Sequence, residues 1–130
     1  MIEFHLDDRS GLSPYLQLVR QVRQALRLGP LDEGDQLPTV KEVVAGLAIN
    51  PNTVLKAYRE LELEGLVEGR PGLGTFVVRS LAGPSLASQA ELRRELQAWL
   101  ERAHAAGLDQ EDVVALVETT MRSSFQEGVA

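Results

Sequence analysis

A cluster of hydrogen-bonding side chains follows a helix-start signal near the middle of the sequence. Asn50 stands directly before Pro51, an arrangement typical of the first turn of a helix. Three more polar residues follow at close spacing: Asn52, Thr53 and Lys56. Side-chain amides and hydroxyls can hydrogen-bond base edges in the major groove of DNA, and an ammonium group can neutralise a phosphate. The pattern is therefore typical of a helix that reads DNA with its amino-terminal end.

The same predicted helix has an apolar face. Apolar residues recur at steps of three and four, as Val54, Ala57, Tyr58 and Leu61. The polar side chains left on the other face are Asn52, Thr53, Lys56 and Arg59. This division predicts a helix that packs on a core and faces a groove. In the plainer alternative, Asn50 and Thr53 only cap the helix. Asn52 and Lys56 would then be ordinary solvated residues.

A glycine-rich segment offers a second contact. The segment from Gly69 to Gly74 contains three glycines and one arginine between two β-prone runs, and it predicts a hairpin tip. Arg70 could enter a minor groove whose narrowness concentrates negative potential. Gly72 and Gly74 would let the backbone approach a phosphate closely. Alternatively, the glycines only form the turn and Arg70 is solvated.

Thr39 and Lys41 form a third candidate contact, at the start of another predicted helix. Thr39 and Glu42 have the spacing of a capping box, in which each side chain bonds the other residue's backbone N–H. The free N–H groups and the dipole of a helix start favour an anion, so we expect a phosphate there. The complete set of expected DNA-contacting residues is Thr39, Lys41, Asn50, Pro51, Asn52, Thr53, Lys56, Arg59, Arg70, Gly72 and Gly74.

The elements that would position these residues follow from periodicity and turn signals. In chain order they are a strand over 2–6, a helix from Pro14 to about Gly29, a turn over 31–35, a short helix from Thr39 to about Leu47, a helix from Asn50 to Gly65, and strands over 66–68 and 75–78. Two helices joined by so short a turn must cross steeply. A helix, a helix-turn-helix and a hairpin in this order predict a winged helix-turn-helix domain.

The last part of the chain predicts only helices. In order, we expect a linker over 80–87, a helix from a capping box at Ser88 and Glu91 to Gly107, and a last helix from Asp109. Two helices of this size rarely form a stable core alone, so we predict that they pack against a second copy of the chain. The expected dimer interface consists of Leu92, Leu96, Trp99, Leu100, Val113, Leu116, Val117, Met121 and Phe125. Trp99 would anchor it, although a ligand-stacking role is an alternative.

Composition argues against several classes of protein. The chain of 130 residues has no cysteine and two isolated histidines, so we expect no disulfide framework, no metal site and no cofactor, with only carboxylates left as possible metal ligands. No apolar run approaches the ~18 residues of a membrane span, and the first residues lack a signal-peptide pattern, which predicts a cytoplasmic protein without membrane contact. No nucleophile-and-base spacing occurs, so we expect no enzyme.

The charge distribution leaves nucleic-acid binding open. The net charge is −6, but residues 1–80 carry nine basic and eleven acidic side chains, whereas residues 81–130 carry four and eight. Phosphate binding depends on the local field of one face, and the acidic excess lies mostly in the tail. The acidic total keeps open a winged-helix module that binds protein, and a small-molecule sensor with a pocket at the dimer interface is a further alternative. Lys56 and Arg70 favour DNA.

Several motifs together resemble a known family. They lie over residues 34–42, 49–58, 64–67 and 72–77. In this order they resemble the N-terminal winged-helix domain of the GntR family of bacterial transcription regulators, over residues 2–79. The Asn-Pro-Asn-Thr start at Asn50 and the short tail resemble its YtrA subfamily. The resemblance implies an α+β fold with a winged helix-turn-helix domain over 1–79, a linker over 80–87 and a two-helix all-α dimerisation region over 88–130.

The resemblance also implies a function, with two departures from the family pattern. It implies a homodimeric, sequence-specific DNA-binding regulator, usually a repressor and often of a transporter operon, on an inverted-repeat operator. It indicates no particular small-molecule effector. Lys41 stands where the family commonly has arginine, and lysine lacks the planar fork for bidentate contacts, which favours a phosphate there over a base. Ala48 stands where glycine is usual, and a positive φ at this residue would cost about 1–2 kcal/mol.

Overall fold

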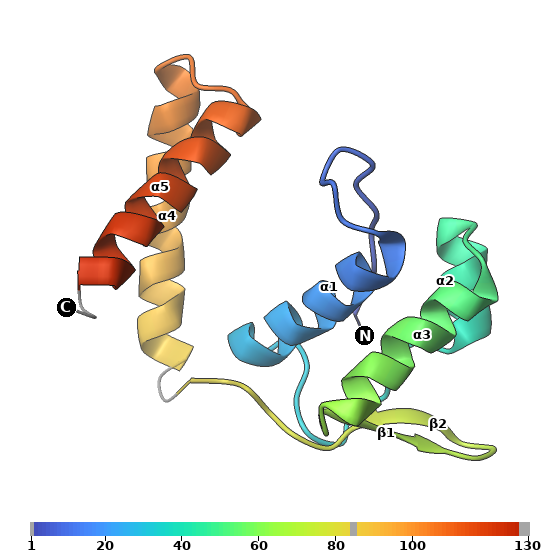
Figure 1. Ribbon diagram of the computed structural model, residues 1–130. Coiled ribbons are helices and arrows are strands. Elements are labelled where there is room, and N and C mark those ends of the chain that lie inside the picture. Colours follow the sequence, from blue (N-terminus) through green and yellow to red (C-terminus); the bar gives the residue numbers. More distant parts are fainter. Residues whose placement is uncertain (1, 84–85, 128–130) are drawn as a thin grey trace. The chain divides into compact units, whose positions relative to one another are not determined.

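The computed structural model describes residues 2–83 and 86–127, and it confirms the predicted α+β class (Figure 1). In these residues the elements are α1 (Pro14–Leu28), α2 (Val40–Leu47), α3 (Pro51–Leu63), β1 (Val67–Arg70), β2 (Gly74–Val77), α4 (Leu86–Ala105) and α5 (Gln110–Glu127). The chain divides into two compact units, Met1–Leu86 and Ala87–Ala130, which we call the winged unit and the tail unit.

The helices of the winged unit begin where local signals predict. Pro14 occupies the first turn of α1, and Gly29, with a left-handed φ of 102°, ends this helix. At the start of α2 the predicted capping box is present. The Thr39 hydroxyl accepts from the N–H of Glu42 (3.1 Å), and the Glu42 carboxylate accepts from the N–H of Thr39 (3.4 Å). Asn50 caps α3 as predicted. These starts were predictable because each depends on side chains within one turn.

The hairpin of β1 and β2 forms the predicted wing, with Arg70 opposite Gly74 where the strands meet the turn (Figure 1). Residues 35–37, which precede α2, pair with the other edge of β2. The N–H of Leu37, for example, donates to the carbonyl of Thr75 (2.9 Å). This pairing was not predicted, because Leu37 is the one apolar residue of this turn-like segment. It ties the wing to the body of the winged unit.

The prediction of a strand over 2–6 is wrong, because this segment belongs to no sheet. Its alternation is nevertheless real, since the partly buried residues that pack on the core are Ile2, Phe4 and Leu6. Glutamines of α1 replace a neighbouring strand. The Gln21 side chain bonds both backbone groups of His5 (3.1 and 2.7 Å), and the Gln17 side chain bonds both backbone groups of Asp7 (2.8 and 3.1 Å). The period-2 pattern predicted burial correctly but not the pairing partner.

The core of the winged unit surrounds α3, which packs against α1, α2 and β1. Its most buried members are Leu18, Val19, Val22, Leu26, Leu31, Leu37, Val54, Ala57, Leu61 and Val77. Burial of each large apolar side chain contributes about 1.5–3 kcal/mol. Arg23 of α1 forms an ion pair with Glu64 at the end of α3. Leu81, from the predicted linker, also packs partly against this core.

The tail unit consists of α4 and α5 within the described residues. α4 begins at Leu86, before the predicted start, so the pair Ser88 and Glu91 lies inside the helix rather than at its cap. Asp109 and Asp112 cap α5 reciprocally: each backbone N–H donates to the other residue's carboxylate, at 3.1 and 2.8 Å. None of the described helices has both the length and the apolar character needed to cross a membrane.

Candidate nucleic-acid interface

Asn50 and Pro51 set the start of α3. The side-chain oxygen of Asn50 accepts from the N–H of Asn52 (2.8 Å), and its carbonyl accepts from the N–H of Thr53 (3.0 Å). The capping explanation of Asn50 is therefore confirmed, and its side-chain NH₂ group stays available to a ligand. Thr53 takes part in this first turn through its backbone. Pro51 is exposed at the first helical position.

The face of α3 that points away from the core is mostly polar at its start, with Pro51 and Leu55 as exposed apolar residues. Asn52, Lys56 and Arg59 are exposed, and Thr53 is half-buried. The opposite face, by contrast, is buried through Val54, Ala57, Tyr58 and Leu61. Because the residues of the outward face come from successive turns, they form one surface along the helix. This arrangement matches the sequence prediction of a helix with one packed and one exposed face.

Tyr15 of α1 contacts Lys56, an interaction that sequence reasoning did not predict. The Lys56 ammonium lies 3.9 Å from the centroid of the Tyr15 ring, a cation–π contact. Tyr15 itself is half-buried and packs against the core of the winged unit. The contact joins α1 to α3, so no spacing within the sequence could have predicted it. It gives the ammonium group a defined position beside the start of α3.

The turn between α2 and α3 contains a strained residue. Ala48 has φ 55° and ψ 44°, and among the described residues it is the non-glycine residue with a positive φ. A left-handed conformation costs an alanine about 1–2 kcal/mol. The positive φ that was considered for Ala48 from the sequence is therefore present. The turn that joins α2 and α3 requires a left-handed conformation at this residue. Glycine would adopt this conformation without strain, but alanine does not.

Thr39 and Lys41 lie exposed at the start of α2, and Tyr58 positions this start relative to α3. The Tyr58 hydroxyl donates to the carbonyl of Pro38 (2.5 Å). Burial raises the pKa of Tyr58 above its ordinary range, and the negative charge of Glu42 raises it further. The hydroxyl therefore stays protonated as a donor. Because Glu42 already supplies a negative charge to this helix start, Lys41 is the residue there that would attract a phosphate.

The wing presents Arg70 on a defined support. The Arg70 guanidinium lies over the Phe76 ring, 4.6 Å from its centroid, and 3.5 Å from the Glu68 carboxylate. Both supporting residues were missed by sequence reasoning, since Glu68 precedes on the same strand and Phe76 lies on the next. Glu68 partly neutralises Arg70, so a phosphate or a groove would have to compete with this exposed ion pair. Such pairs are worth at most about 1 kcal/mol.

The wing glycines have structural reasons of their own. Gly72 and Gly74 have φ of 76° and 128°, which other residues rarely adopt. A Cβ at Gly74 would lie 2.5 Å from the amide nitrogen of Gln36, which itself donates to the Leu73 carbonyl (3.2 Å). The turn explanation of these glycines is therefore confirmed. Gln36 is a further residue that sequence reasoning missed, and it braces the wing against the segment before α2.

An open hollow brings the wing and the start of α2 together. It has a volume of about 640 Å³ and is lined by Thr39, Glu62 and wing residues from Gly69 to Thr75. Two of the three predicted contacts, Thr39 and Arg70, thus lie at one hollow. Glu62 of α3 adds a carboxylate that was not considered from the sequence. In the part of the chain that the structure describes, no group of histidine, aspartate and glutamate could hold a metal ion.

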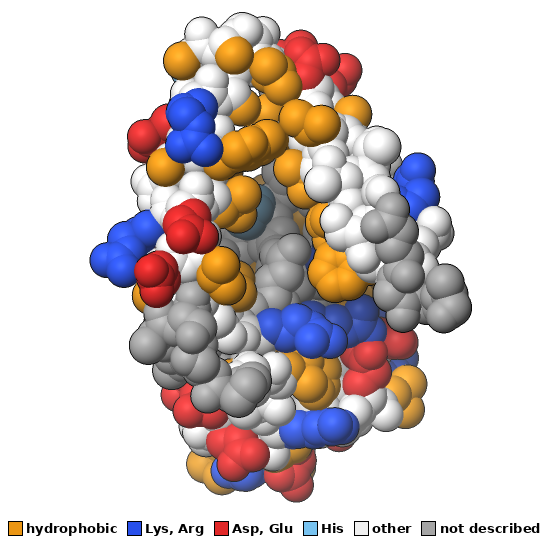
Figure 2. All heavy atoms as spheres, turned by 90° about the vertical axis from the view of Figure 1, so that its left-hand side faces the viewer, with side chains coloured by type: hydrophobic (Ala, Val, Ile, Leu, Met, Phe, Trp, Pro, Cys, Tyr) orange, Lys and Arg blue, Asp and Glu red, His pale blue; other side chains and the backbone are white. Residues whose placement is uncertain are grey.

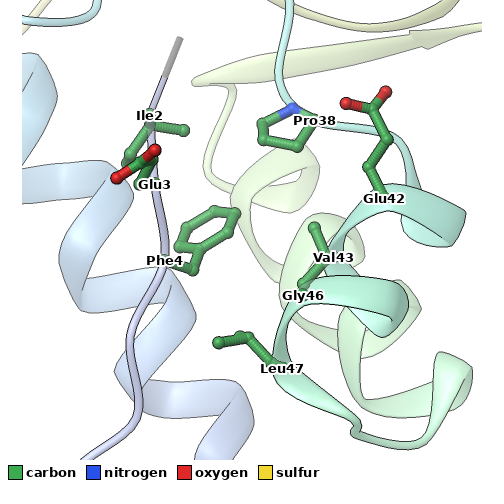
Figure 3. Close-up of a pocket in the computed structure, with 8 residues that line it drawn as sticks. All are labelled: Ile2, Glu3, Phe4, Pro38, Glu42, Val43, Gly46 and Leu47. Atoms are coloured by element: carbon green, nitrogen blue, oxygen red, sulfur yellow. The ribbon is translucent and has the colours of Figure 1, made fainter.

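A smaller hollow of about 390 Å³ lies between the N-terminal segment and α2 (Figure 3). In Figure 3 the Phe4 ring points from the N-terminal segment toward α2, and the Leu47 side chain points from α2 toward the N-terminal segment. Glu3 and Glu42 add two carboxylates to an otherwise mostly apolar lining. None of the described residues that line it belongs to the expected DNA-contacting set. It is therefore separate from the surface formed by α3 and the wing.

The tail unit brings several predicted interface residues together. A hollow of about 370 Å³ is lined by Leu96, Trp99, Leu116, Val117, Thr120 and Met121. Hydrophobic side chains gather on this unit in Figure 2. Three further predicted residues, Leu92, Leu100 and Phe125, are exposed, and Val113 is half-buried. The tail unit thus keeps much of its apolar surface in contact with solvent.

Comparison with known proteins gives one consistent family. A family model described as bacterial regulatory proteins of the gntR family matches residues 14–77. The HTH-type transcriptional repressor YtrA of Bacillus subtilis is 35% identical over 107 residues, which are 82% of this chain and 82% of that protein. The solved structure of YtrA from Sulfolobus acidocaldarius, titled a GntR-family transcription factor, is 26% identical with a TM-score of 0.52 and covers 94% of this chain and 97% of that one.

A solved protein–DNA complex is also similar. It contains the DNA-binding domain of AraR with operator ORR3, and the protein chain is 25% identical with a TM-score of 0.50. The likeness covers 59% of this chain and 93% of that chain. The Bacillus subtilis relative is named a transcriptional repressor and the Sulfolobus acidocaldarius structure a transcription factor; neither is named an enzyme, which agrees with the sequence expectation.

Proposed function

The chain belongs to the GntR family of bacterial regulatory proteins, and from this premise we propose that it is a homodimeric repressor that binds an inverted-repeat operator. Membership makes it a DNA-binding transcription regulator; the dimer, the symmetry of the operator and the sign of regulation are our proposal. The observation that carries it is the exposed polar start of α3, which lies on a helix whose other face is fully packed.

We assign the first turns of α3 to the major groove. Asn52 and Thr53 would hydrogen-bond base edges, and an asparagine amide pairs well with adenine. Lys56, held by Tyr15, and Arg59 would neutralise phosphates beside the groove. Asn50 and Pro51 would contact DNA from the helix start. The solved complex of the similar AraR domain with its operator supports this use of the fold.

The wing and α2 would complete the contact. Arg70 would enter the minor groove, where a narrow width concentrates negative potential. Gly72 and Gly74 carry no side chain that would keep the backbone from a phosphate. Thr39 and Lys41 would contact a phosphate at the start of α2, and the hollow that Thr39 shares with the wing supports a common ligand for both.

We further propose that the tail unit forms the dimer. This proposal keeps the division expected from the sequence, a winged domain over 1–79, a linker over 80–87 and a dimerisation region over 88–130, except that α4 already begins at Leu86. Support comes from the tail's exposed apolar residues, such as Leu92 at 62% and Phe125 at 73%. Two helices with this little internal burial need a partner. A twofold dimer would set two half-sites about one helical turn of DNA apart, ~34 Å, or a multiple of it.

The relatives support a proposal for the sign and the target of regulation. The Bacillus relative is named a repressor, which supports repression here. The resemblance to the YtrA subfamily extends the proposal to a transporter operon. Because chromosomal DNA is the proposed ligand, we place the protein in the cytoplasm.

Selection from random DNA tests this proposal. The full chain should enrich an inverted repeat from a library of random duplexes, and its affinity for that repeat should fall with salt. Lys56→Ala and Arg70→Ala should each weaken binding and lower the salt slope by about one unit, because each removes one positive charge that neutralises phosphate charge of the duplex. Arg93→Ala, which removes an exposed arginine of α4, is the matched control and should leave the slope unchanged. Failure to enrich any duplex would instead favour a winged domain that binds protein.

A further inference from the structure

Leu55 is the apolar residue that interrupts the polar start of α3. It is 44% exposed, whereas Val54 directly before it and Ala57 two residues after it are completely buried. Slightly more than half of its surface is covered within the winged unit, and the rest is open. Leu55 therefore presents its side chain to whatever α3 faces.

Its position on the helix distinguishes Leu55 from an ordinary exposed leucine. Leu55 follows Pro51 by four residues and Asn52 by three, so the three side chains are neighbours on the helix surface. Asn52 and Pro51 are also exposed. The first turns of α3 thus offer one amide and two apolar groups side by side. A leucine at this place offers a ligand of α3 an apolar contact beside the Asn52 amide.

Only one base edge of ordinary DNA offers such a partner. In the major groove, the 5-methyl group of thymine is the apolar feature, and the other edges carry hydrogen-bond donors or acceptors. We propose that Leu55 recognises a thymine methyl group in each operator half-site. The base pair concerned is the one read by Asn52 or a pair next to it, because both side chains come from adjacent turns. This inference rests on the proposed operator binding by α3.

The operator selected by the full chain supplies the probe. Each thymine in one half-site is replaced singly by deoxyuridine, which removes the methyl group and keeps the base pairing. Because one buried methyl contributes ~0.8 kcal/mol, the wild-type Kd should rise about fourfold at one thymine and stay unchanged at the others. In the Leu55→Ala variant the same replacement should have no effect, and its own Kd for the thymine operator should be weaker by a similar factor.

Leu63→Ala is the matched control. It makes the same substitution on the same helix at a residue that is 79% exposed, but two turns farther from the start of α3. It should keep the full response to deoxyuridine. Circular dichroism should show that both variants fold, since both leucines are exposed.

The outcomes separate this inference from the proposed function. A selected operator in which no thymine methyl matters would overturn the role of Leu55 and leave operator binding intact. A methyl effect that persists in Leu55→Ala would overturn it as well, because another group would then make the contact. If the wild-type chain selects no operator, the proposed function fails and this inference fails with it.

Discussion

The winged unit and the tail unit use amphipathic helices with opposite results. In the winged unit the apolar faces meet one another, and Leu18, Val54 and Leu61 are all 0% exposed. In the tail unit Leu92 and Phe125 remain 62% and 73% exposed. Three helices and a hairpin enclose a core, whereas two helices cannot cover both of their apolar faces. Apolar periodicity thus predicts which face of a helix is apolar, but the number of neighbouring elements decides whether that face is buried.

The largest expected difference between the units is in the response to leucine truncation. Leu61→Ala leaves a cavity in the closed core and should lower the free energy of unfolding by about 2–5 kcal/mol. Leu92→Ala removes exposed surface and should change it by less than about 0.5 kcal/mol when the chain is monomeric. Urea unfolding followed by circular dichroism, at low protein concentration, measures both. Equal losses would show that the two units do not differ in this way.

Trp99 tests whether the apolar surface of the tail unit forms the dimer interface. If the tail forms the dimer, Trp99→Ala should raise the dimer Kd by roughly 30- to 1000-fold, the range for a loss of 2–4 kcal/mol at an aromatic hot spot. Leu63→Ala, an equally conspicuous exposed apolar residue in the winged unit, should leave the Kd unchanged. Sedimentation velocity over a dilution series distinguishes the two. An unaltered Kd in Trp99→Ala would remove the tail from the dimer interface.

The ionisation of Tyr58 tests whether its side chain is buried in the core of the winged unit. Burial raises its pKa in the folded chain, so the unfolded chain loses this proton first as the pH rises. Stability should therefore be unaffected by this group below about pH 10 and fall above it by up to ~1.4 kcal/mol per pH unit. Tyr58→Phe should lack this component, and at neutral pH it should lose about 1 kcal/mol with the hydrogen bond to Pro38. Identical alkaline profiles would contradict the buried state of Tyr58.

The smallest effect is expected at the strained turn. Ala48→Gly relieves the positive φ, and after the entropy cost of glycine the net gain should be about 0.5–1 kcal/mol. Ala45→Gly, in the ordinary helical part of α2, is the matched control and should instead lose about 1 kcal/mol. Thermal or urea unfolding of the two variants gives opposite signs on this account. A loss in both would mean that the turn carries no strain.

The sequence predicted what depends on nearby residues. The starts of α1, α2 and α3 were predictable because Pro14, Thr39 with Glu42, and Asn50 act within one helical turn. The start of α4 was misplaced because Ser88 and Glu91 have capping-box spacing in a segment that is already helical. Local signals cannot tell whether an earlier residue has started the helix.

Contacts between distant segments were beyond sequence reasoning. Nothing in the sequence around the glutamines of α1 indicated that their side chains would hydrogen-bond the backbone of His5 and Asp7 in place of a neighbouring strand. The support of Lys56 by Tyr15 and of Arg70 by Phe76 also depends on how separate elements pack or pair. The candidate residues themselves were found from their types and spacing. What the fold adds is the set of side chains that hold them in place.

The most direct test of DNA reading by α3 is the base preference of Asn52→Ala. Because Asn52 is exposed and makes its capping bond through the backbone, the variant should fold normally. Site selection with wild type and variant should show relaxed preference at one base position per half-site, with a cost of ~1–3 kcal/mol for the operator and an unchanged salt slope. Identical base preferences in the two proteins would contradict the placement of this helix start against the bases.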